Sequence, residues 1–590
     1  MTDATPPVVS TAPTCSPACS KHISLGTAVA VVLGFVLALL AGYFILTRND
    51  PSPVSANPGG QEAKPQDKKD DKKKVAAPEL DGGSAWLNTA GPLSLKKDLK
   101  GKIVLLDFWT LCCINCIHIQ PDLAKLEKKY PNELVVIGVH SPKFENEKET
   151  ASIRKAILRY QLEHPVINDA DHKIWDKYDV EAWPTLVLID PEGNIVGYIS
   201  GEGNYEILDK VIGNLVEEHK KKKTLDVTPI RFDLAKYRES GDTPLFFPGK
   251  VLADAKNNRL FIADSTHHRI VITDLDGKFL AIAGSGTPGK ADGTFDKAEF
   301  HDPQGMAVSG NTLYVADRKN HVLRMLDLTA KTVTTIAGNG EQEGDPNSRR
   351  IDKAVPAKSI GLNSPWDLLL DGDTLYVAMA GHHQIWALDL KKKELVPYAG
   401  TGKETLGDGL LWKAHFAQPS GLASDGKNLY VADSEISSIR KVQLTSGELS
   451  RVSTLVGRSL FVFGDRDGPG QIEDEVTRET KEARIQHALG VVYHEGMLYI
   501  ADTYNNKIKV FDLKSKELKT FAGGGGDWGW VMPATFSEPA GISYAAGKLY
   551  VADTNAHRIR VIDIATRSVK TLELKGVNPP PMPKEPKPKK

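Results

Sequence analysis

The chain has 590 residues, several times the usual length of one folded domain, so more than one domain is expected. Hydrophobic residues make up 41% of it and charged residues 25%, as in folded globular proteins, which excludes a wholly disordered or fibrous chain. Its 74 basic and 75 acidic residues give a net charge of −1. This balance argues against a protein built mainly to coat nucleic acid, so no nucleic acid is expected among its partners.

Residues 1–22, with many Pro, Thr and Ser, are predicted to be a disordered tail. Residues 23–46 carry no charged side chain, and about 20 apolar residues suffice to cross a bilayer. A cleavable signal peptide has a shorter apolar region and small residues at the cleavage site, neither of which fits. A buried core helix would have nothing to pack against. We therefore predict one transmembrane helix, whose nearly balanced flanking charges leave its orientation open.

A linker rich in Pro, Lys and Asp is predicted over 47–78. From 79 to 220, apolar strand patterns alternate with helix patterns, which is typical of an α/β domain. Strands are expected at KIVLLDFW, ELVVIGVH, TLVLID and NIVGYI, and helices near 113–130 and 147–160. Residues 221–242 are either a linker or a strand that closes the following domain.

The second half of the sequence repeats itself in six units. Their shared motif occurs as LFIADSTHHRI, LYVADRKNHVL, LYVAMAGHHQI, LYVADSEISSI, LYIADTYNNKI and LYVADTNAHRI, starting at 260, 313, 375, 429, 498 and 549. Period-2 alternation between turn residues gives about four short strands per unit. Such units are typical of propeller blades, so we predict a six-bladed all-β propeller over 243–576. The Pro- and Lys-rich residues 577–590 are expected to be a solvated tail.

These repeats resemble those of NHL-repeat propellers. An aspartate ends the motif strand in five of the six units: Asp264, Asp317, Asp433, Asp502 and Asp553. We expect each carboxylate to accept backbone N–H groups of a turn, because a residue repeated in most blades is usually architectural. In the third unit Met379 replaces it. Paired histidines recur at the same turn, as His267, His268, His382 and His383, but without further ligands at metal-binding spacing they give only a weak metal hypothesis.

The five cysteines are too few for a disulfide-stapled scaffold and lie only at 15, 19, 112, 113 and 116. Cys113 is predicted to open a helix, where unpaired N–H groups and the helix dipole stabilise a thiolate. Cys116, one turn later, is placed to attack a mixed disulfide formed at Cys113. A zinc half-site is the alternative, but no second CxxC or paired-histidine motif follows, so we expect no metal and no cofactor beyond the dithiol itself.

This segment resembles the thioredoxin-like superfamily, in particular its membrane-tethered TlpA-like branch. The match covers Cys113-Ile114-Asn115-Cys116 and Pro121 in the following helix. The resemblance implies a cis-proline turn at Trp183-Pro184-Thr185 that faces the cysteines. It also implies that Asp107 is the buried carboxylate that helps to deprotonate Cys116; a strand-end residue bound to backbone is the alternative. Cys112 replaces the usual Trp and is either a buried structural thiol or a third redox partner.

A thioredoxin-like domain joined to such a propeller resembles the second type of NHL-repeat-containing protein over about 80–575, with the membrane anchor lying outside the match. The resemblance implies a thiol–disulfide oxidoreductase that acts on a partner protein with a disulfide or thiols. Together with the predicted anchor, we expect a membrane-anchored enzyme in which a propeller face binds a protein. The soluble domains are expected on the extracytoplasmic side. The alternative is a non-catalytic tethered scaffold in which the propeller carries the function.

Overall fold

The computed structural model describes residues 74–237, 243–344, 353–444, 449–524 and 535–580. The predicted tail at 1–22, the predicted membrane helix at 23–46 and nearly all of the linker at 47–78 lie outside these ranges, as do residues 581–590. Within the described ranges, none of the helices combines the length and the apolar composition that a bilayer crossing requires.

The first domain is built on a seven-stranded sheet of order β1-β7-β6-β3-β4-β5-β2. Its central strand, β3, pairs in parallel with β4 and antiparallel with β6. The strands are β1 (Val75–Ala76), β2 (Ala85–Leu87), β3 (Ile103–Trp109), β4 (Leu134–His140), β5 (Val166–Asn168), β6 (Thr185–Ile189) and β7 (Asn194–Ser200). The helices are α2 (Ile114–Lys129), α3 (Thr150–Tyr160), α4 (Lys173–Lys177) and α5 (Tyr205–Lys222).

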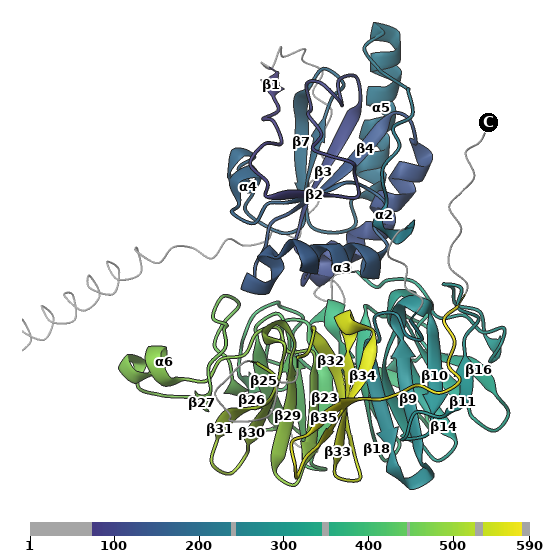
Figure 1. Cartoon of the computed structure of the whole chain (residues 1–590), viewed down its shortest axis with the longest axis vertical. Coiled ribbons are helices and arrows are strands. Elements are labelled where there is room, and N and C mark those ends of the chain that lie inside the picture. Colours follow the sequence, from purple (N-terminus) through teal and green to yellow (C-terminus); the bar gives the residue numbers. More distant parts are fainter. Residues whose placement is uncertain (1–73, 238–242, 345–352, 445–448, 525–534, 581–590) are drawn as a thin grey trace, which may run out of the picture. The chain divides into compact units, whose positions relative to one another are not determined.

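Both faces of this sheet are covered. Helices α2 and α5 lie together on one face of the sheet (Figure 1), where Leu123, Leu126 and Ile212 join one apolar cluster. Ile174 and Tyr178 at α4 join the apolar cluster on the other face. Every residue of β3 and β4 is buried, which explains why these strands are continuous apolar runs. The expected strands and helices of the α/β domain are confirmed.

The second domain consists of six antiparallel sheets, which confirms the six-bladed propeller. In blades one to three the four main strands are β8 (Lys250–Asp254), β9 (Arg259–Asp264), β10 (Arg269–Thr273), β11 (Phe279–Ala283); β13 (Pro303–Ser309), β14 (Thr312–Asp317), β15 (Val322–Asp327), β16 (Thr332–Ala337); β18 (Pro365–Asp371), β19 (Thr374–Met379), β20 (Gln384–Asp389) and β21 (Glu394–Ala399). In blades four to six they are β23 (Pro419–Ser424), β24 (Asn428–Asp433), β25 (Ser438–Gln443), β26 (Arg451–Val456); β28 (Gly490–His494), β29 (Met497–Asp502), β30 (Lys507–Asp512), β31 (Glu517–Ala522); β32 (Pro539–Ala545), β33 (Lys548–Asp553), β34 (Arg558–Asp563) and β35 (Val569–Thr571).

Blades two to five also carry a short outer strand, which precedes the blade in sequence: β12 (Gly293–Thr294), β17 (Val355–Pro356), β22 (Gly409–Leu410) and β27 (Gly468–Pro469). Helix α6 (Glu475–Lys481) lies in the insertion before blade five. Residues 223–237 contain a single 3-10 turn, Ala235–Tyr237, and no strand. Blade one is instead joined by the C-terminal segment, because Lys575 O accepts the Phe279 N–H at 3.0 Å.

The first strand of each blade lines the propeller axis, and these six strands contact one another in sequence around the ring. One buried cation, Lys250, ties several blades together across the axis. Its ammonium donates to Asp367 Oδ2 at 3.1 Å, Ser420 O at 2.6 Å and Leu489 O at 2.7 Å. Because all three ammonium protons have acceptors, this charge is satisfied inside the propeller.

The repeated aspartates hold the blades as expected. Each Oδ1 accepts a backbone N–H from the turn that leads into its own blade, at 2.6 to 2.8 Å, and the donors are Phe246, His301, Ala417, Gln486 and Ser537. Each Oδ2 faces a cation on the next strand: Arg269, Arg324, Arg440, Lys509 and Arg558. In blade three both charges are absent, and Trp386 Nε1 donates to Gln384 instead. Blade three therefore lacks both the carboxylate and its partner cation, so no buried cation is left without a carboxylate there.

A second repeated bond joins each blade to the next. The residue at the entry to each first strand has a left-handed backbone, and five of the six precede a proline; we call them the ring residues: Phe247, Asp302, Ser364, Gln418, His487 and Glu538. Each donates its N–H to the side chain that ends the turn of the preceding blade, and the acceptors are His557, His268, His321, His383, Ser437 and Asn506. His268 and His383 are therefore hydrogen-bond acceptors between blades. The bond from Phe247 to His557 closes the ring.

The charged pair of blade four gives a test of this architecture. Asp433 and Arg440 both have no exposed side-chain surface, and the Arg440 guanidinium also pairs with Asp408 at 2.8 Å. Asp433→Met is expected to destabilise the propeller by about 1–3 kcal/mol, because it removes the buried one of the two carboxylates that face this guanidinium. Adding Arg440→Met makes the pair apolar, as in blade three, and should recover part of this loss. Denaturant unfolding of the single and double variants measures the difference, with Arg451→Met on the exposed edge of β26 as the control. A double variant no more stable than Asp433→Met would contradict the account.

Candidate functional site: a dithiol site against the propeller

The candidate site lies where β3 ends and α2 begins. Cys113 is the N-cap of α2, and its sulfur accepts the Cys116 N–H at 3.2 Å. The Cys113 N–H donates to Thr110 O at 3.3 Å, which closes the turn between strand and helix. Cys112, Cys113 and Cys116 are all unpaired, so the site is described as a dithiol, and no disulfide joins Cys113 to Cys116 in this structure.

The thiol environment of Cys113 differs from the one expected from sequence. The helix start and the Cys116 N–H favour a thiolate, but burial raises the pKa of Cys113 above its ordinary value, and Glu435 and Glu404 raise it further. The expectation of a lowered pKa is therefore wrong for this arrangement. Its cause is the neighbouring propeller, which removes water from the thiol and adds carboxylates that sequence spacing does not reveal.

Asp107 and Cys116 lie together in the interior. Both are fully buried, and Gln120 Nε2 donates to Asp107 Oδ2 at 3.1 Å while Oδ1 has no hydrogen-bond partner among the described residues. Burial raises the pKa of Asp107 to about 7. Burial raises the pKa of Cys116 well above its ordinary value, with smaller increases from Cys113 and Asp107. A carboxyl group that titrates near neutral pH beside a high-pKa thiol is suited to accept the thiol proton.

Cys112 is buried, as the simpler interpretation of this thiol predicts. Its sulfur lies 3.8 Å from Glu435 Oε1 of the propeller. Its backbone N–H donates to Glu147 Oε1 at 3.0 Å, and Glu147 Oε2 accepts the Thr110 hydroxyl at 2.6 Å. Burial raises the pKa of Cys112 well above its ordinary value, with further increases from Glu147 and Glu435. The buried carboxylate of Glu147 thereby holds the turn that precedes the dithiol.

The proline turn implied by the thioredoxin resemblance is present. The Trp183–Pro184 peptide bond is cis, and β6 begins at the next residue, Thr185. Trp183 and Cys113 pack against the same apolar cluster, which also contains Cys112 and Cys116. The structure thus brings together Asp107, Cys112, Cys113 and Cys116 with the Pro184 turn, although which of them act in catalysis stays a prediction.

The propeller contacts the dithiol turn directly. The side chain of Ile114, the residue after Cys113, is buried among Trp366, Ala380, Leu489 and Ala540, which belong to blades three, five and six. The Ile114 N–H donates to Gln418 Oε1 at 3.0 Å, and Gln418 Nε2 donates to Cys112 O at 3.0 Å. The start of α2 is therefore seated on the end of the propeller axis.

Other ring residues extend this contact. His118 Nε2 and the Ser364 hydroxyl lie 2.7 Å apart, and Arg159 on α3 donates to Glu538 at 2.8 Å. The rings of His487 and Phe144 are 5.5 Å apart, and the Arg159 guanidinium lies 5.4 Å from the centre of the Phe247 ring. With Gln418, five of the six ring residues contact the first domain.

A buried ion pair lies beside Cys112. Lys143 Nζ is 2.5 Å from Glu435 Oε1 and also donates to Glu435 O at 3.0 Å. Both side chains are more than nine-tenths buried. Burial opposes the charge of Lys143, but Glu435 keeps the pKa of Lys143 above its ordinary value. Sequence analysis missed Lys143, Glu147, Gln418 and Glu435, because no motif or spacing distinguishes them from surrounding polar residues.

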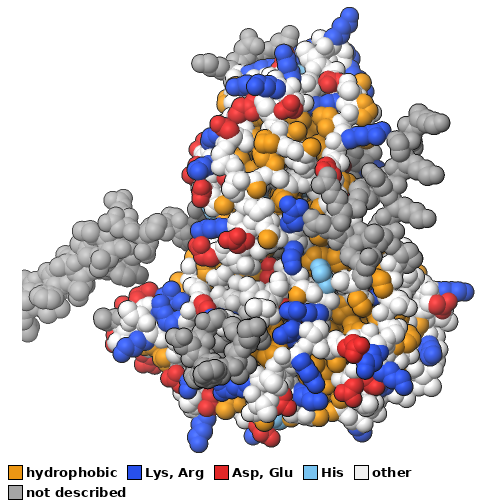
Figure 2. Space-filling view, viewed as in Figure 1, with side chains coloured by type: hydrophobic (Ala, Val, Ile, Leu, Met, Phe, Trp, Pro, Cys, Tyr) orange, Lys and Arg blue, Asp and Glu red, His pale blue; other side chains and the backbone are white. Residues whose placement is uncertain are grey.

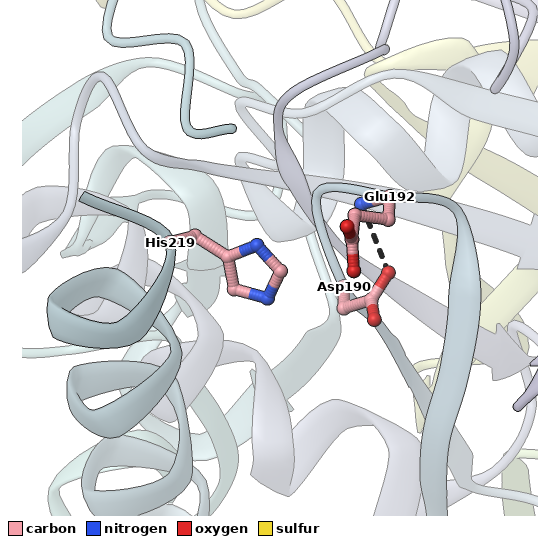
Figure 3. Close-up of side chains that lie close together, drawn as sticks. All are labelled: Asp190, Glu192 and His219. Atoms are coloured by element: carbon pink, nitrogen blue, oxygen red, sulfur yellow. Dashed lines mark hydrogen bonds between the residues drawn. The ribbon is translucent and has the colours of Figure 1, made fainter. Parts of the chain in front are cut away.

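Three side chains of types that can bind a metal lie close together in the first domain, away from the dithiol. Asp190 and Glu192, after β6, and His219 on α5 have ligand atoms within 4.8 Å of one another (Figure 3). Lys74 Nζ is already 2.5 Å from Glu192 and 3.4 Å from Asp190, and His219 Nδ1 bonds the Thr224 hydroxyl at 2.7 Å. These ion pairs and this hydrogen bond explain why the three side chains lie close together.

On the face of the molecule shown in Figure 2, basic and acidic side chains are interspersed. A nucleic-acid surface would gather Lys and Arg in one patch or stripe.

Two family models match the chain. The thioredoxin-like model covers residues 101–195, and the NHL-repeat model covers residues 300–324 and 536–562. NHL repeat-containing protein 2 of Gallus gallus is 42% identical over 85% of this chain and 72% of that protein. Protein SUPPRESSOR OF QUENCHING 1, chloroplastic, of Arabidopsis thaliana is 42% identical over 86% of this chain and 48% of that protein. Thiol-disulfide oxidoreductase YkuV of Bacillus subtilis (strain 168) is 27% identical over 24% of this chain and 94% of that protein.

The raised pKa of Asp107 makes stability depend on pH. Between its ordinary pKa near 3.8 and about 7, the folded chain keeps a proton that the unfolded chain has lost, so this group lowers stability as pH rises through that interval. Asp107→Asn removes the effect. Its free energy of unfolding should exceed that of the wild type increasingly from pH 4 to pH 7, by up to about 4 kcal/mol.

Denaturant unfolding of the first domain, followed at several pH values, measures this difference. Asp122→Asn, on the outer side of α2 beside Lys125, is the matched control and should show little change. A stability difference for Asp107→Asn that does not vary with pH would contradict the buried-carboxyl account.

Proposed function

The chain belongs to the NHL repeat-containing protein 2 family, and we propose that it is a thiol–disulfide oxidoreductase whose propeller both supports the dithiol and binds a partner protein. The observation that carries this proposal is the placement of the three reacting groups. Cys113 is partly exposed at the start of α2, Cys116 is buried one turn further on, and Asp107 lies beside Cys116 with a pKa near 7.

The proposed reaction is a thiol–disulfide exchange in two steps. The Cys113 thiolate attacks one sulfur of a partner disulfide, and the other partner sulfur leaves as a thiolate that takes up a proton. The Cys116 thiol gives its proton to Asp107 and its sulfur attacks the Cys113 sulfur, which releases the second partner thiol. The partner disulfide is then reduced to two thiols, and Cys113–Cys116 is oxidised. The reverse sequence oxidises a partner dithiol.

The site needs no bound cofactor for this exchange, because the two sulfurs carry the electrons. The name of the Bacillus subtilis relative, a thiol-disulfide oxidoreductase, supports the reaction class for residues of the first domain. The propeller supports a binding role through its repeated blades, which are typical of interaction domains. The partner is proposed as a protein that presents a disulfide or a pair of thiols.

We also propose that residues 23–46 anchor the chain in a membrane as a single span, with the domains from residue 79 onwards on the extracytoplasmic side. The uncharged apolar run supports the anchor. The confinement of the thiols to positions up to 116 supports an oxidising compartment, since no stray thiol of the propeller could be trapped there.

Cysteine variants of the full chain test the reaction. Cys116→Ser should accumulate a mixed disulfide with a partner or with glutathione at Cys113, because the resolving thiol is missing, whereas Cys113→Ser should form none. Thiol trapping in graded redox buffers, followed by peptide mapping, measures the Cys113–Cys116 couple. Cys112→Ser is the control and should leave the couple in place. If no disulfide joins Cys113 to Cys116 at any potential, the oxidoreductase proposal fails and the tethered scaffold replaces it.

Charges placed in the apolar run test the anchor. Val32→Arg together with Val36→Arg is expected to move the protein from the membrane fraction to the soluble fraction, since each arginine at the centre of a span costs about 2.5–3.5 kcal/mol. Fractionation after alkaline extraction measures this. Recovery of the unaltered chain in the soluble fraction would contradict the anchor.

A further inference from the structure

We propose that Gln418 of the propeller is a positioning residue of the dithiol site, because its side-chain amide holds the backbone on both sides of Cys113. This inference rests on the proposed function. It assigns to the propeller a part in tuning the reactive thiol, in addition to binding a partner.

The orientation of the Gln418 amide is fixed by its partners. Oε1 accepts from the Ile114 N–H, which can only donate, and Nε2 donates to Cys112 O, which can only accept. The side chain is buried, with 1% of its surface exposed. Its own backbone N–H is held by His383 Nδ1 of the preceding blade at 3.1 Å. Gln418 is therefore rigidly supported by the propeller before it reaches the dithiol turn.

The acceptor role of Oε1 bears on the electrostatics of Cys113. The Ile114 N–H belongs to the first residue of α2 and has no partner within the helix. Such N–H groups form the positive end of the helix dipole, which stabilises a thiolate at the N-cap. The negative end of the Gln418 side-chain carbonyl, Oε1, lies against this N–H. Gln418 thus offsets part of the stabilisation that the helix start offers to a Cys113 thiolate.

The other ring residues with contacts to the first domain bond at different places. Ser364 reaches His118 and Glu538 reaches Arg159, whereas His487 and Phe247 contribute ring contacts. Among the described ring residues, Gln418 is the one whose side chain bonds the backbone on both sides of Cys113. This position in blade four therefore has a role that the repeat itself does not require.

Other charged groups also lie near the dithiol and influence the pKa values of its thiols. Glu435 and Glu404 come from the propeller and disfavour a Cys113 thiolate, while Lys143 pairs with Glu435 and reduces its effect. Glu147 lies on the far side of Cys112, and Asp107 lies beside Cys116. Replacing Gln418 alters none of these side chains, so a change in Cys113 reactivity is assigned to the amide.

Two nearly isosteric variants test the assignment in the full chain. Gln418→Met leaves the Ile114 N–H without its acceptor, so the alkylation midpoint of Cys113 should move to lower pH. Below that midpoint the thiolate fraction should rise by about three- to tenfold. Gln418→Glu keeps an acceptor oxygen, so its midpoint should stay at or above that of the wild type. Iodoacetamide modification across pH, with Cys113 identified by tandem mass spectrometry, measures all three proteins.

Gln304→Met is the matched control. Gln304 is also a buried glutamine of the propeller, but its side chain bonds Ser265 and Asp302, within the propeller. This variant should keep the wild-type alkylation profile, and thermal unfolding checks that all four proteins are folded. If Gln418→Met leaves the midpoint unchanged or raises it, or if Gln418→Glu lowers it equally, the assignment is overturned. Alkylation of Cys113 does not depend on disulfide formation, so this test can fail or succeed independently of the oxidoreductase proposal.

Discussion

Burial of Ile114 at the end of the propeller axis is the contact on which the environment of the dithiol depends. A CxxC turn at the edge of a free domain would be surrounded by water on its outer side. Here Ile114, the first of the two residues between the motif cysteines, is packed among three blades, and Cys113 is left partly exposed beside them. Desolvation and propeller carboxylates then control the thiol, and they oppose the helix dipole at the same atom. The dithiol site is therefore formed by both domains.

The ring residues show how one repeat position can do two tasks. The backbone N–H of each one bonds the preceding blade, and this bond does not use the side chain of the ring residue. The side chain is then free to differ from blade to blade. Serine, glutamine and glutamate at this position bond different groups of the first domain. A left-handed backbone at non-glycine residues costs free energy, and it persists here because several bonds fix it.

The parts that sequence could predict are those set by nearby residues. The strand before Cys113, the helix after it and the six repeats follow from local periodicity, and the bond from Asp433 to the Ala417 N–H joins residues of one repeat. The contact from Gln418 to Ile114 joins residues 304 positions apart. Gln418 stands before a proline in a turn, where polar residues are common, so nothing local marks it. The pKa direction of Cys113 could not be predicted for the same reason, since Glu435 and Glu404 belong to another domain.

The six different ring side chains also remove a rotational ambiguity. A propeller of similar blades has approximate sixfold symmetry, so its end could in principle receive the first domain in six equivalent settings. Turning the first domain by one blade would take Arg159 away from Glu538 and the Cys112 carbonyl away from the Gln418 amide. Each wrong setting leaves buried polar groups unpaired, at about 1–3 kcal/mol for each group. The asymmetry of one residue per repeat thus selects a single orientation on a nearly symmetric surface.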